Sequence, residues 1–207
     1  MITKTQSSDP PATSRALRRA DDRKLAILRA AARVFRERGY ANAGMRDIAS
    51  AADLSPANLY YYFSGKDEIL YFCQDRSLAR MTSEVGMAKS SKISVKEQLR
   101  RVLLTHILCL LDDVEGSVAH LETEALPPAL RTKIVEKRDQ YEKSIRSLLS
   151  QGAANGEFEL SDTTLTARAI LGAINWTARW FRPDGKQSAK YVAENTVAFL
   201  LNGLSPK

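Results

Sequence analysis

Residues 45–63 read MRDIASAADLSPANLYYYF, and this stretch carries the strongest structural information in the chain. Apolar residues recur at helical spacing in two short segments, residues 45–52 and 56–63, with a short polar turn between them. Ser55 followed by Pro56 is typical of a helix start, because a serine side chain caps unpaired backbone N–H groups and proline fits the first helical position. The stretch therefore predicts two short helices joined by a tight turn.

A longer helix is expected directly upstream, over residues 22–38. Ile27, Ala31 and Phe35 recur at four-residue spacing, and Gly39 ends the pattern. A long helix packed against two short ones makes a helix-turn-helix unit, whose second short helix can enter the major groove of DNA. The pattern thus favours a DNA-binding unit in this part of the chain.

The rest of the chain also follows the helical period, and no segment shows the alternation of a strand. The sequence therefore predicts an all-α protein with an N-terminal three-helix helix-turn-helix unit and a C-terminal helical body. The longest apolar stretch, residues 102–111, is much shorter than the roughly 20 residues that a membrane-spanning helix needs, so no membrane span is expected. Beyond the helix-turn-helix unit, we expect helices over residues 66–84, 95–110, 117–125, 127–151, 161–181 and 187–202.

Positive charge is concentrated in the first third of the chain. The whole sequence has 31 Lys and Arg against 24 Asp and Glu, whereas residues 1–66 alone have twelve basic residues against six acidic ones. A basic segment attached to a nearly neutral body is typical of a module that binds a polyanion, although a solvated charged surface gives the same count. Residues 1–20, with Arg15, Arg18 and Arg19, are expected to form a mobile basic arm whose arginines either add affinity for phosphates or stay solvated.

Catalytic and metal-binding patterns are absent from the sequence. It has no glycine-rich phosphate loop, nucleophile elbow or plausible catalytic triad, so we expect neither an enzyme nor a bound cofactor. Cys73 and Cys109 lack the spacing of a disulfide framework or a zinc site and are expected to be small buried residues. The first residues lack the apolar segment of a secretory signal, which favours a cytoplasmic protein.

The stretch from Arg23 to Leu70 resembles the DNA-binding domain of the TetR family of bacterial transcriptional repressors. The resemblance covers about 48 contiguous residues without a gap. Two positions depart from the family pattern: Gly44 stands where members usually carry Thr or Ser as a helix cap, and Tyr62 stands where His is frequent. The aromatic signature of the family is present as LYYYF at residues 59–63 and is followed by a polar set, Ser64, Lys66, Asp67 and Glu68.

This resemblance implies a repressor that binds a palindromic double-stranded DNA operator as a homodimer and leaves it when a small molecule binds. It divides the chain after the basic arm into a DNA-binding domain over residues 21–66 and a ligand-binding and dimerisation domain over residues 67–207. Short side chains at the start of the second short helix imply base contacts, and the tyrosines and the following lysine imply phosphate contacts. By helical spacing, one of the three adjacent tyrosines should instead face the core. The candidate DNA-binding residues are Arg23, Arg46, Ser55, Pro56, Ala57, Asn58, Tyr60, Tyr61, Tyr62 and Lys66.

The predicted helix over residues 161–181 is apolar around more than one face. Such a helix must be covered twice, once by its own core and once by something else, and a partner subunit is the economical explanation. The resemblance likewise implies that the last two helices pair with those of a second copy. The candidate dimer-interface residues are Ile170, Ile174, Phe181, Tyr191 and Phe199.

A polar stripe follows the same helix at steps of three and four residues, with Arg168, Gly172, Asn175, Arg179 and Arg182 as its members. The segments LGAINWTARWFRPDG and KRDQYEKSIRSLLSQGAANGEF resemble a TetR subgroup that responds to coenzyme A (CoA) thioesters of lipid, steroid and aromatic-acid degradation. This second resemblance implies a CoA thioester as the effector, with arginines on its phosphates and apolar side chains around its acyl part. The candidate ligand-binding residues are Leu103, His106, Ile107, Leu110, Arg138, Tyr141, Trp176, Arg179, Trp180 and Arg182.

Other interpretations stay open at this point. The arginines of the stripe could form ion pairs at a surface or interface, and a lone histidine such as His106 on an apolar helix face is more often a hydrogen-bonded core residue than a ligand contact. His120 likewise gives no stronger evidence for a ligand contact. A multidrug-responsive repressor of an efflux system would have the same fold, but a pocket for lipophilic cations favours carboxylates and aromatic rings over arginines. A constitutive DNA-binding protein would have no effector.

Overall fold

The computed structural model describes residues 12–111 and 122–206, with side chains from Ala20 onward. All regular secondary structure within these ranges is helical, which confirms the all-α fold. The elements are α1 (Ala12–Asn42), α2 (Met45–Ala51), α3 (Pro56–Tyr62), α4 (Lys66–Ser90), α5 (Val95–Leu111), the 3₁₀ turn η1 (Thr123–Ala125), α7 (Pro128–Ala154), α8 (Thr163–Trp180) and α9 (Ala189–Asn202).

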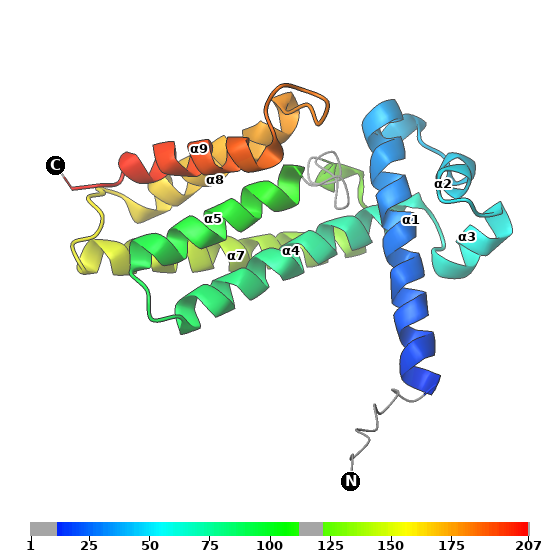
Figure 1. Cartoon of the computed structure of the whole chain (residues 1–207), viewed down its shortest axis with the longest axis horizontal. Helices are drawn as coiled ribbons and strands as arrows, with labels where there is room; N and C mark the ends of the chain where they lie inside the picture. Colours follow the sequence, from blue (N-terminus) through cyan, green and yellow to red (C-terminus); the bar gives the residue numbers. More distant parts are fainter. Residues whose placement is uncertain (1–11, 112–121, 207) are drawn as a thin grey trace, which may run out of the picture.

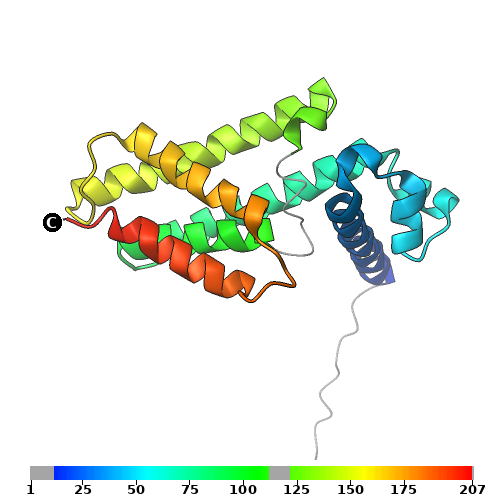
Figure 2. The same ribbon diagram turned by 90° about the horizontal axis from the view of Figure 1, so that it is seen from above.

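The helices form two groups that α4 joins (Figure 1). α1, α2 and α3 pack together at one end, with α1 running across the long axis of the molecule, and α4, α5, α7, α8 and α9 form a bundle along that axis. The view from above shows α4 leading from the three-helix group into the bundle (Figure 2). Because α4 contacts α1 on one side and α5 and α7 on the other, it links the two groups mechanically.

The core of the bundle is built around α5. This helix contacts α4, α7, α8 and α9, and its Leu99, Leu103 and Ile107 are fully buried. Burial of each such side chain contributes about 1.5–3 kcal/mol relative to exposure in water. The apolar pattern of α5 on more than one side therefore reflects a helix that is enclosed by its neighbours.

The three-helix group has an apolar centre of its own. Ile27, Ala31 and Phe35, the predicted inner face of α1, are buried together with Ile48 of α2 and Leu59 of α3. The four-residue spacing seen in the sequence thus marks the side of α1 that holds the two short helices.

Helix boundaries differ from the expectation in two places. α1 begins at Ala12, so residues 12–20 of the expected arm are helical in the structure; the alanines and arginines there are strong helix formers. α4 continues to Ser90, six residues further than expected, and ends at the predicted serine-rich break. Gly39 has a left-handed φ of 73° and interrupts α1 as expected, although helical turns resume as far as Asn42.

The helix expected over residues 117–125 is described only in part. Its first residues, His120 among them, lie outside the described residues. Thr123–Ala125 forms the short turn η1. Within residues 12–111 and 122–206, no helix is both long enough and apolar enough to cross a membrane. Also outside the description are the side chains of Arg15, Arg18 and Arg19.

Candidate functional site

α3 begins with the cap that the sequence predicts. The Ser55 Oγ accepts a hydrogen bond from the Asn58 N–H at 3.2 Å, and Pro56 lies in the first helical turn. The turn before α3 is tight because Asp53 adopts a left-handed φ of 52°, a conformation that aspartate tolerates better than most residues. The side chains at the start of α3 are exposed, so they are available to an external partner; they are Ser55, Pro56, Ala57 and Asn58.

The three tyrosines of α3 differ in exposure. Tyr61 is 84% exposed and Tyr60 is 55% exposed. Tyr62 is partly buried and packs edge-on against Tyr61, with ring centroids 5.2 Å apart, so it is the member of the run that turns toward the protein. Because α3 contains no Lys or Arg, its outer face presents hydroxyls, short side chains and backbone groups.

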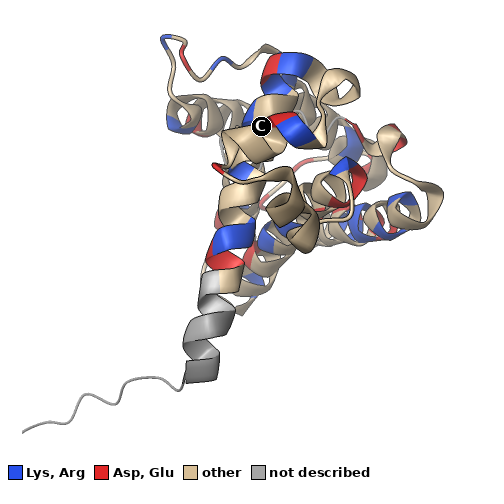
Figure 3. Ribbon diagram, turned by 90° about the vertical axis from the view of Figure 1, so that its right-hand side faces the viewer, with Lys and Arg blue, Asp and Glu red and all other residues tan. Residues whose placement is uncertain are grey.

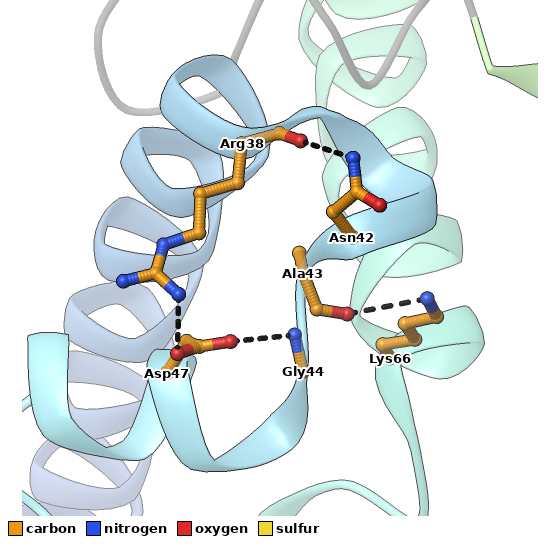
Figure 4. Close-up of polar contacts among 6 residues, drawn as sticks. All are labelled: Arg38, Asn42, Ala43, Gly44, Asp47 and Lys66. Atoms are coloured by element: carbon orange, nitrogen blue, oxygen red, sulfur yellow. Dashed lines mark hydrogen bonds and ion pairs between the residues drawn. The ribbon is translucent and has the colours of Figure 1, made fainter.

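α2 is fastened to α1 at both ends. The Arg38 guanidinium pairs with the Asp47 carboxylate at 2.7 Å, and the same carboxylate accepts the Gly44 N–H at 3.0 Å (Figure 4). At the other end of α2, the Arg33 Nη2 donates to the Ala51 carbonyl at 2.9 Å. Asp47 thus provides a hydrogen-bond acceptor and a negative charge at the start of α2. This explains how glycine serves at the cap position, where the family that the sequence resembles usually has Thr or Ser.

Lys66, expected on a phosphate, is directed at α1 instead (Figure 4). Its Nζ donates to the carbonyls of Tyr40, Ala41 and Ala43 at 3.0, 3.2 and 3.2 Å. The Tyr40 hydroxyl in turn bonds to the Asp67 carboxylate, and burial, together with this carboxylate, raises the pKa of Tyr40. An ammonium has three donors, and protein carbonyls occupy them here, so Lys66 has a contact within the protein that the sequence did not predict, and its phosphate contact stays a prediction. We call these contacts of Lys66, Tyr40 and Asp67 the α1–α4 clamp.

Positive charge near α3 comes from its neighbours. Residues 20–66 hold eight Lys and Arg against five Asp and Glu. Figure 3 faces this end of the molecule and shows basic residues along α1 above its grey segment. Arg46 is exposed on α2, whereas Arg23 is half-buried on α1. A polyanion that contacts α3 would therefore meet positive charge beside it.

A cavity of about 450 Å³ lies between α4, α5, α7 and α8. Its volume is within the roughly 300–1,000 Å³ of small-molecule sites. Its wall combines apolar side chains with two arginines, Arg138 and Arg168, and two carboxylates, Asp139 and Glu142. Arg168 and Glu142 lie 3.9 Å apart, so one positive and one negative charge partly offset each other. The lining residues are Leu78, Met81, His106, Leu110, Arg138, Asp139, Tyr141, Glu142, Arg168, Leu171, Gly172 and Asn175.

His106 and Tyr141 stand against each other in the cavity wall, with ring centroids 5.3 Å apart. Burial lowers the pKa of His106 to about 4; the charge of Arg138 adds to this effect and a hydrogen bond with Asn175 opposes it. Burial also raises the pKa of Tyr141. Both side chains are therefore uncharged at neutral pH.

The low pKa of His106 predicts a loss of stability in mild acid. The unfolded chain binds a proton at this histidine below pH 6.5, whereas the folded protein does so only near pH 4. The free energy of unfolding is therefore fully retained above pH 6.5 and falls as the pH drops toward 4, by about 2 kcal/mol at pH 5. Urea unfolding at pH 5 and pH 7.5 measures this difference. His106→Asn should remove most of it and His120→Gln should leave it; an unchanged difference in the His106 variant would contradict the assignment.

An apolar surface lies over α8 and α9. Trp176 is 65% exposed and Phe199 is 77% exposed. Between the start of α8 and the end of α9 this surface opens into a groove of about 450 Å³ that Phe199 helps to line. Exposed apolar side chains that gather in this way mark an interaction surface. We call it the apolar face; its large members are Leu165, Trp176, Trp180, Tyr191 and Phe199.

Comparison with known proteins decides the family of this chain. Residues 27–71 match the bacterial regulatory proteins of the tetR family, and residues 92–204 match the tetracyclin repressor-like C-terminal domain. The chain belongs to the TetR family. The two matched ranges contain the helix-turn-helix and most of the bundle, respectively.

Known TetR-family proteins cover nearly the whole chain. The crystal structure of the transcriptional regulator PfmR from Thermus thermophilus is 35% identical, covers 87% of this chain and 99% of its own, and has a TM-score of 0.77. AibR in complex with isovaleryl coenzyme A and operator DNA is 26% identical over 86% of this chain and 98% of its own, with a TM-score of 0.73. The fatty acid metabolism regulator protein of Bacillus subtilis (strain 168) is 27% identical over 87% of this chain and 95% of its own length.

Part of the predicted ligand set lines the cavity of this TetR-family regulator. His106, Leu110, Arg138 and Tyr141 are in its wall. The other members are not. Leu103 and Ile107 are fully buried in the core around α5, and the cavity does not reach them. The remaining members lie on α8 or beyond it, outside the lining of this cavity: Trp176, Arg179, Trp180 and Arg182.

Only the first three members of the polar stripe on α8 line the cavity, because the helix continues beyond it. Arg168, Gly172 and Asn175 line the cavity, and Asn175 bonds to the His106 ring that closes this part of the wall. The later turns of α8 therefore continue past the cavity, where Arg179 is exposed to solvent and Arg182 borders a separate groove of about 320 Å³.

Sequence reasoning missed the contribution of α4 to the cavity. Leu78 and Met81 line it, and they continue a pattern of buried residues that begins at Gln74 with steps of four and three. That spacing was visible in the sequence and marks one helix face. Asp139, Glu142 and Leu171 were also missed, because nothing in the sequence tells which turns of α7 and α8 face each other.

Two predicted dimer contacts of this TetR-family protein are buried in its own core. Ile170 and Ile174 face α5 and the bundle interior, and Phe181 is partly buried. Tyr191 and Phe199 are exposed as expected. The sequence showed two apolar sides on α8 but not which of them faces the protein; the side with the tryptophans faces outward.

Proposed function

We propose that this TetR-family regulator is a repressor that binds a palindromic double-stranded DNA operator as a homodimer and is released from it by an acyl-CoA thioester of a catabolic pathway. The observation that carries the proposal is the cavity between α4, α5, α7 and α8, whose wall joins apolar side chains to two arginines. A regulator of this kind works in the bacterial cytoplasm and performs no catalysis. Turnover of an acyl-CoA by the purified protein would contradict this part of the proposal.

In this proposal α3 is the helix that enters the major groove. Its exposed start, from Ser55 to Asn58, is short enough for base edges to approach, and the hydroxyls of Tyr60 and Tyr61 meet phosphates. Arg46 adds affinity that does not depend on sequence. Residues 21–66 thus form the DNA-binding domain and residues 67–207 the part that binds the effector and the second subunit.

The apolar face is assigned to the dimer. It spans α8 and α9 and includes the groove beside Phe199, which a second copy would fill. A two-fold dimer presents two α3 helices to the two halves of a palindrome.

The cavity suits the acyl part of a thioester better than the whole molecule. Leu78, Met81 and Leu110 offer apolar contacts, and Arg138 and Arg168 offer charge for phosphate groups that stay nearer the solvent. The structure of the relative AibR with isovaleryl coenzyme A and operator DNA supports a ligand of this class, as does the name of the fatty acid metabolism regulator of Bacillus subtilis.

Arg138 also connects the cavity to α4. Its Nη2 donates to the Gln74 Oε1 at 3.3 Å, and the adjacent Lys137 pairs with Asp75. An anionic ligand that draws Arg138 toward itself would compete with Gln74 and shift α4 relative to α7. Release of DNA then requires that the ligand bind the DNA-free arrangement more tightly than the DNA-bound one.

Substitution of Arg138 by alanine is the test of the effector class. We expect the affinity for isovaleryl-CoA to fall about tenfold or more, because a charge-assisted hydrogen bond contributes about 1.5–3 kcal/mol. Isothermal titration calorimetry measures the change, and the affinity for operator DNA should be retained. Arg179→Ala, on the exposed part of α8, is the matched control and should bind as the wild type does. Equal binding of free isovaleric acid and its thioester would refute the thioester proposal.

A repressor that responds to lipophilic cations is the second candidate. Asp139 and Glu142 line the same cavity, and carboxylates stabilise a cationic ligand as well as they pair with arginine. Rhodamine 6G is a suitable probe. Release of operator DNA by this dye, but not by isovaleryl-CoA, together with loss of dye binding in Glu142→Gln, would favour the control of an efflux system.

A further inference from the structure

We propose that His106 and Tyr141 form a subsite that binds one uncharged oxygen atom, a carbonyl or a hydroxyl, of the effector. The inference rests on the proposed function in one respect, namely that the effector occupies the cavity between α4, α5, α7 and α8. It goes further because it states which chemical group the effector places against the inner wall.

The first observation is a pair of polar atoms without a partner. His106 and Tyr141 are 5% and 4% exposed and both line the cavity. Within the part of the chain that the structure describes, neither the His106 Nδ1 nor the Tyr141 hydroxyl has a hydrogen bond. Two other buried atoms share this status, but Glu84 Oε1 has an ion-pair partner, Arg101, at 2.9 Å, and Arg146 Nε lies 3.7 Å from a Glu142 oxygen. The two unpartnered groups without such compensation therefore occur together, in one cavity.

An unsatisfied polar group inside a protein is costly and uncommon. The two rings pack edge-on, with centroids 5.3 Å apart, and both line the same cavity, so an atom of a ligand in that cavity can approach both groups. Each group is versatile: a hydroxyl both donates and accepts, and the free ring nitrogen of a neutral imidazole does one or the other according to its tautomer. The missing partner is therefore an atom that a ligand brings into the cavity.

The surroundings favour an uncharged partner. Burial keeps both rings neutral, with the pKa of His106 depressed and that of Tyr141 raised. The nearby cation, Arg138, lies half-buried in the wall, and the proposed function assigns its charge to the phosphate groups of the thioester. A carboxylate at the His106–Tyr141 pair would lose its hydration beside two neutral rings, whereas a carbonyl or hydroxyl oxygen loses far less.

A thioester offers two sources of such an oxygen. One is the thioester carbonyl itself, and the other is a keto or hydroxyl group farther along the acyl chain. Three CoA derivatives separate the sources: S-butyl-CoA, a thioether without either oxygen, butyryl-CoA, with the carbonyl, and 3-hydroxybutyryl-CoA, with both. Hexan-2-one is added as a probe that carries a carbonyl but no CoA.

The experiment measures the affinity of each probe for the wild type, for Tyr141→Phe and for the control Tyr71→Phe, whose tyrosine is on α4 outside the lining of the cavity. We expect the wild type to bind an oxygen-bearing derivative at least about fivefold more tightly than the matched compound that lacks the oxygen. The step between S-butyl-CoA and butyryl-CoA identifies the thioester carbonyl, and the step to 3-hydroxybutyryl-CoA identifies a chain oxygen. Tyr141→Phe should abolish this preference, and Tyr71→Phe should keep it. A preference that survives in Tyr141→Phe, or no preference in the wild type, overturns the subsite.

The unliganded protein gives a second, independent measurement. If the Tyr141 hydroxyl has no partner, Tyr141→Phe melts at the same temperature as the wild type or higher. A fall of more than about 3 °C would show that the hydroxyl is already bonded to the protein or to a resident water, and would overturn the proposal. If no CoA derivative binds but hexan-2-one binds the wild type more tightly than Tyr141→Phe, the effector class is wrong and the oxygen subsite stands. If no CoA derivative binds and hexan-2-one binds the wild type and Tyr141→Phe equally, the subsite is refuted.

Discussion

Phe199→Asp should convert the protein to a monomer that no longer binds its operator tightly. Phe199 is 77% exposed at the apolar face and lines the groove between α8 and α9. A carboxylate placed there would be buried without a partner on dimerisation, which costs several kcal/mol in each subunit. Because a dimer holds two halves of the operator at once, we expect operator affinity to fall by about 10²–10⁴-fold.

Sedimentation equilibrium and DNA binding on the same preparations measure both effects. Val135→Asp is the matched control, because Val135 is an exposed apolar residue on α7, outside the apolar face. It should leave both the dimer and DNA binding intact. Ile174 is unsuitable for this test, since it is fully buried and a charge there would disrupt the fold of the subunit itself. A wild-type monomer at micromolar concentration would refute the assigned interface.

Tyr61→Ala should weaken binding to every DNA sequence by about 10²–10⁴-fold. A hydrogen bond to a charged group contributes about 1.5–3 kcal/mol, and the dimer loses it twice. Tyr61 is the most exposed tyrosine of α3, and phosphate contacts carry no base information, so the base preference should not change. Binding to a DNA site selected in vitro, and to random DNA, measures the loss.

Asn58→Ala is the counterpart to this variant, because its side chain lies at the exposed start of α3 and should affect base preference. A changed base preference in Tyr61→Ala with intact non-specific affinity would reverse the two assignments. Lys66→Ala is not a clean test of phosphate contact, since it also removes three hydrogen bonds of the α1–α4 clamp.

Local features of the fold could be predicted from the sequence. The Ser55 cap, the break at Gly39 and the buried face of α1 depend on neighbours within one or two helical turns, and the structure has each of them. The start of α1 could not be placed in the same way. The polar composition of residues 1–20 favours an arm, whereas the alanines and arginines of residues 12–20 favour a helix, and composition alone does not decide between them.

The site was predictable only as far as single helices determine it. His106 could be identified because it is a lone histidine on an apolar helix face, and Arg138 because its segment resembles the subgroup that responds to CoA thioesters; both line the cavity. The orientation of α8 was not, because both of its sides are apolar and the choice between them depends on how α5 and α7 pack against it. Lys66 shows the same limit: its partners, the carbonyls around Tyr40, are more than 20 residues away in the sequence.

The α1–α4 clamp has a consequence for how a ligand could act at a distance. Lys66 and Asp67 bond to the end of α1, and Lys24 of α1 lies 5.5 Å from the ring of Phe72, so the first two turns of α4 are tied to the three-helix group. α4 has 25 residues and is therefore about 38 Å long, so a tilt of about 5° at its far end carries this group about 3 Å. The major groove of B-form DNA repeats about every 34 Å, and the DNA does not stretch to match a shift of the three-helix group. For the repressor proposed above, induction would then need no rearrangement of the surface that reads the bases; a mismatch in half-site spacing would release the DNA.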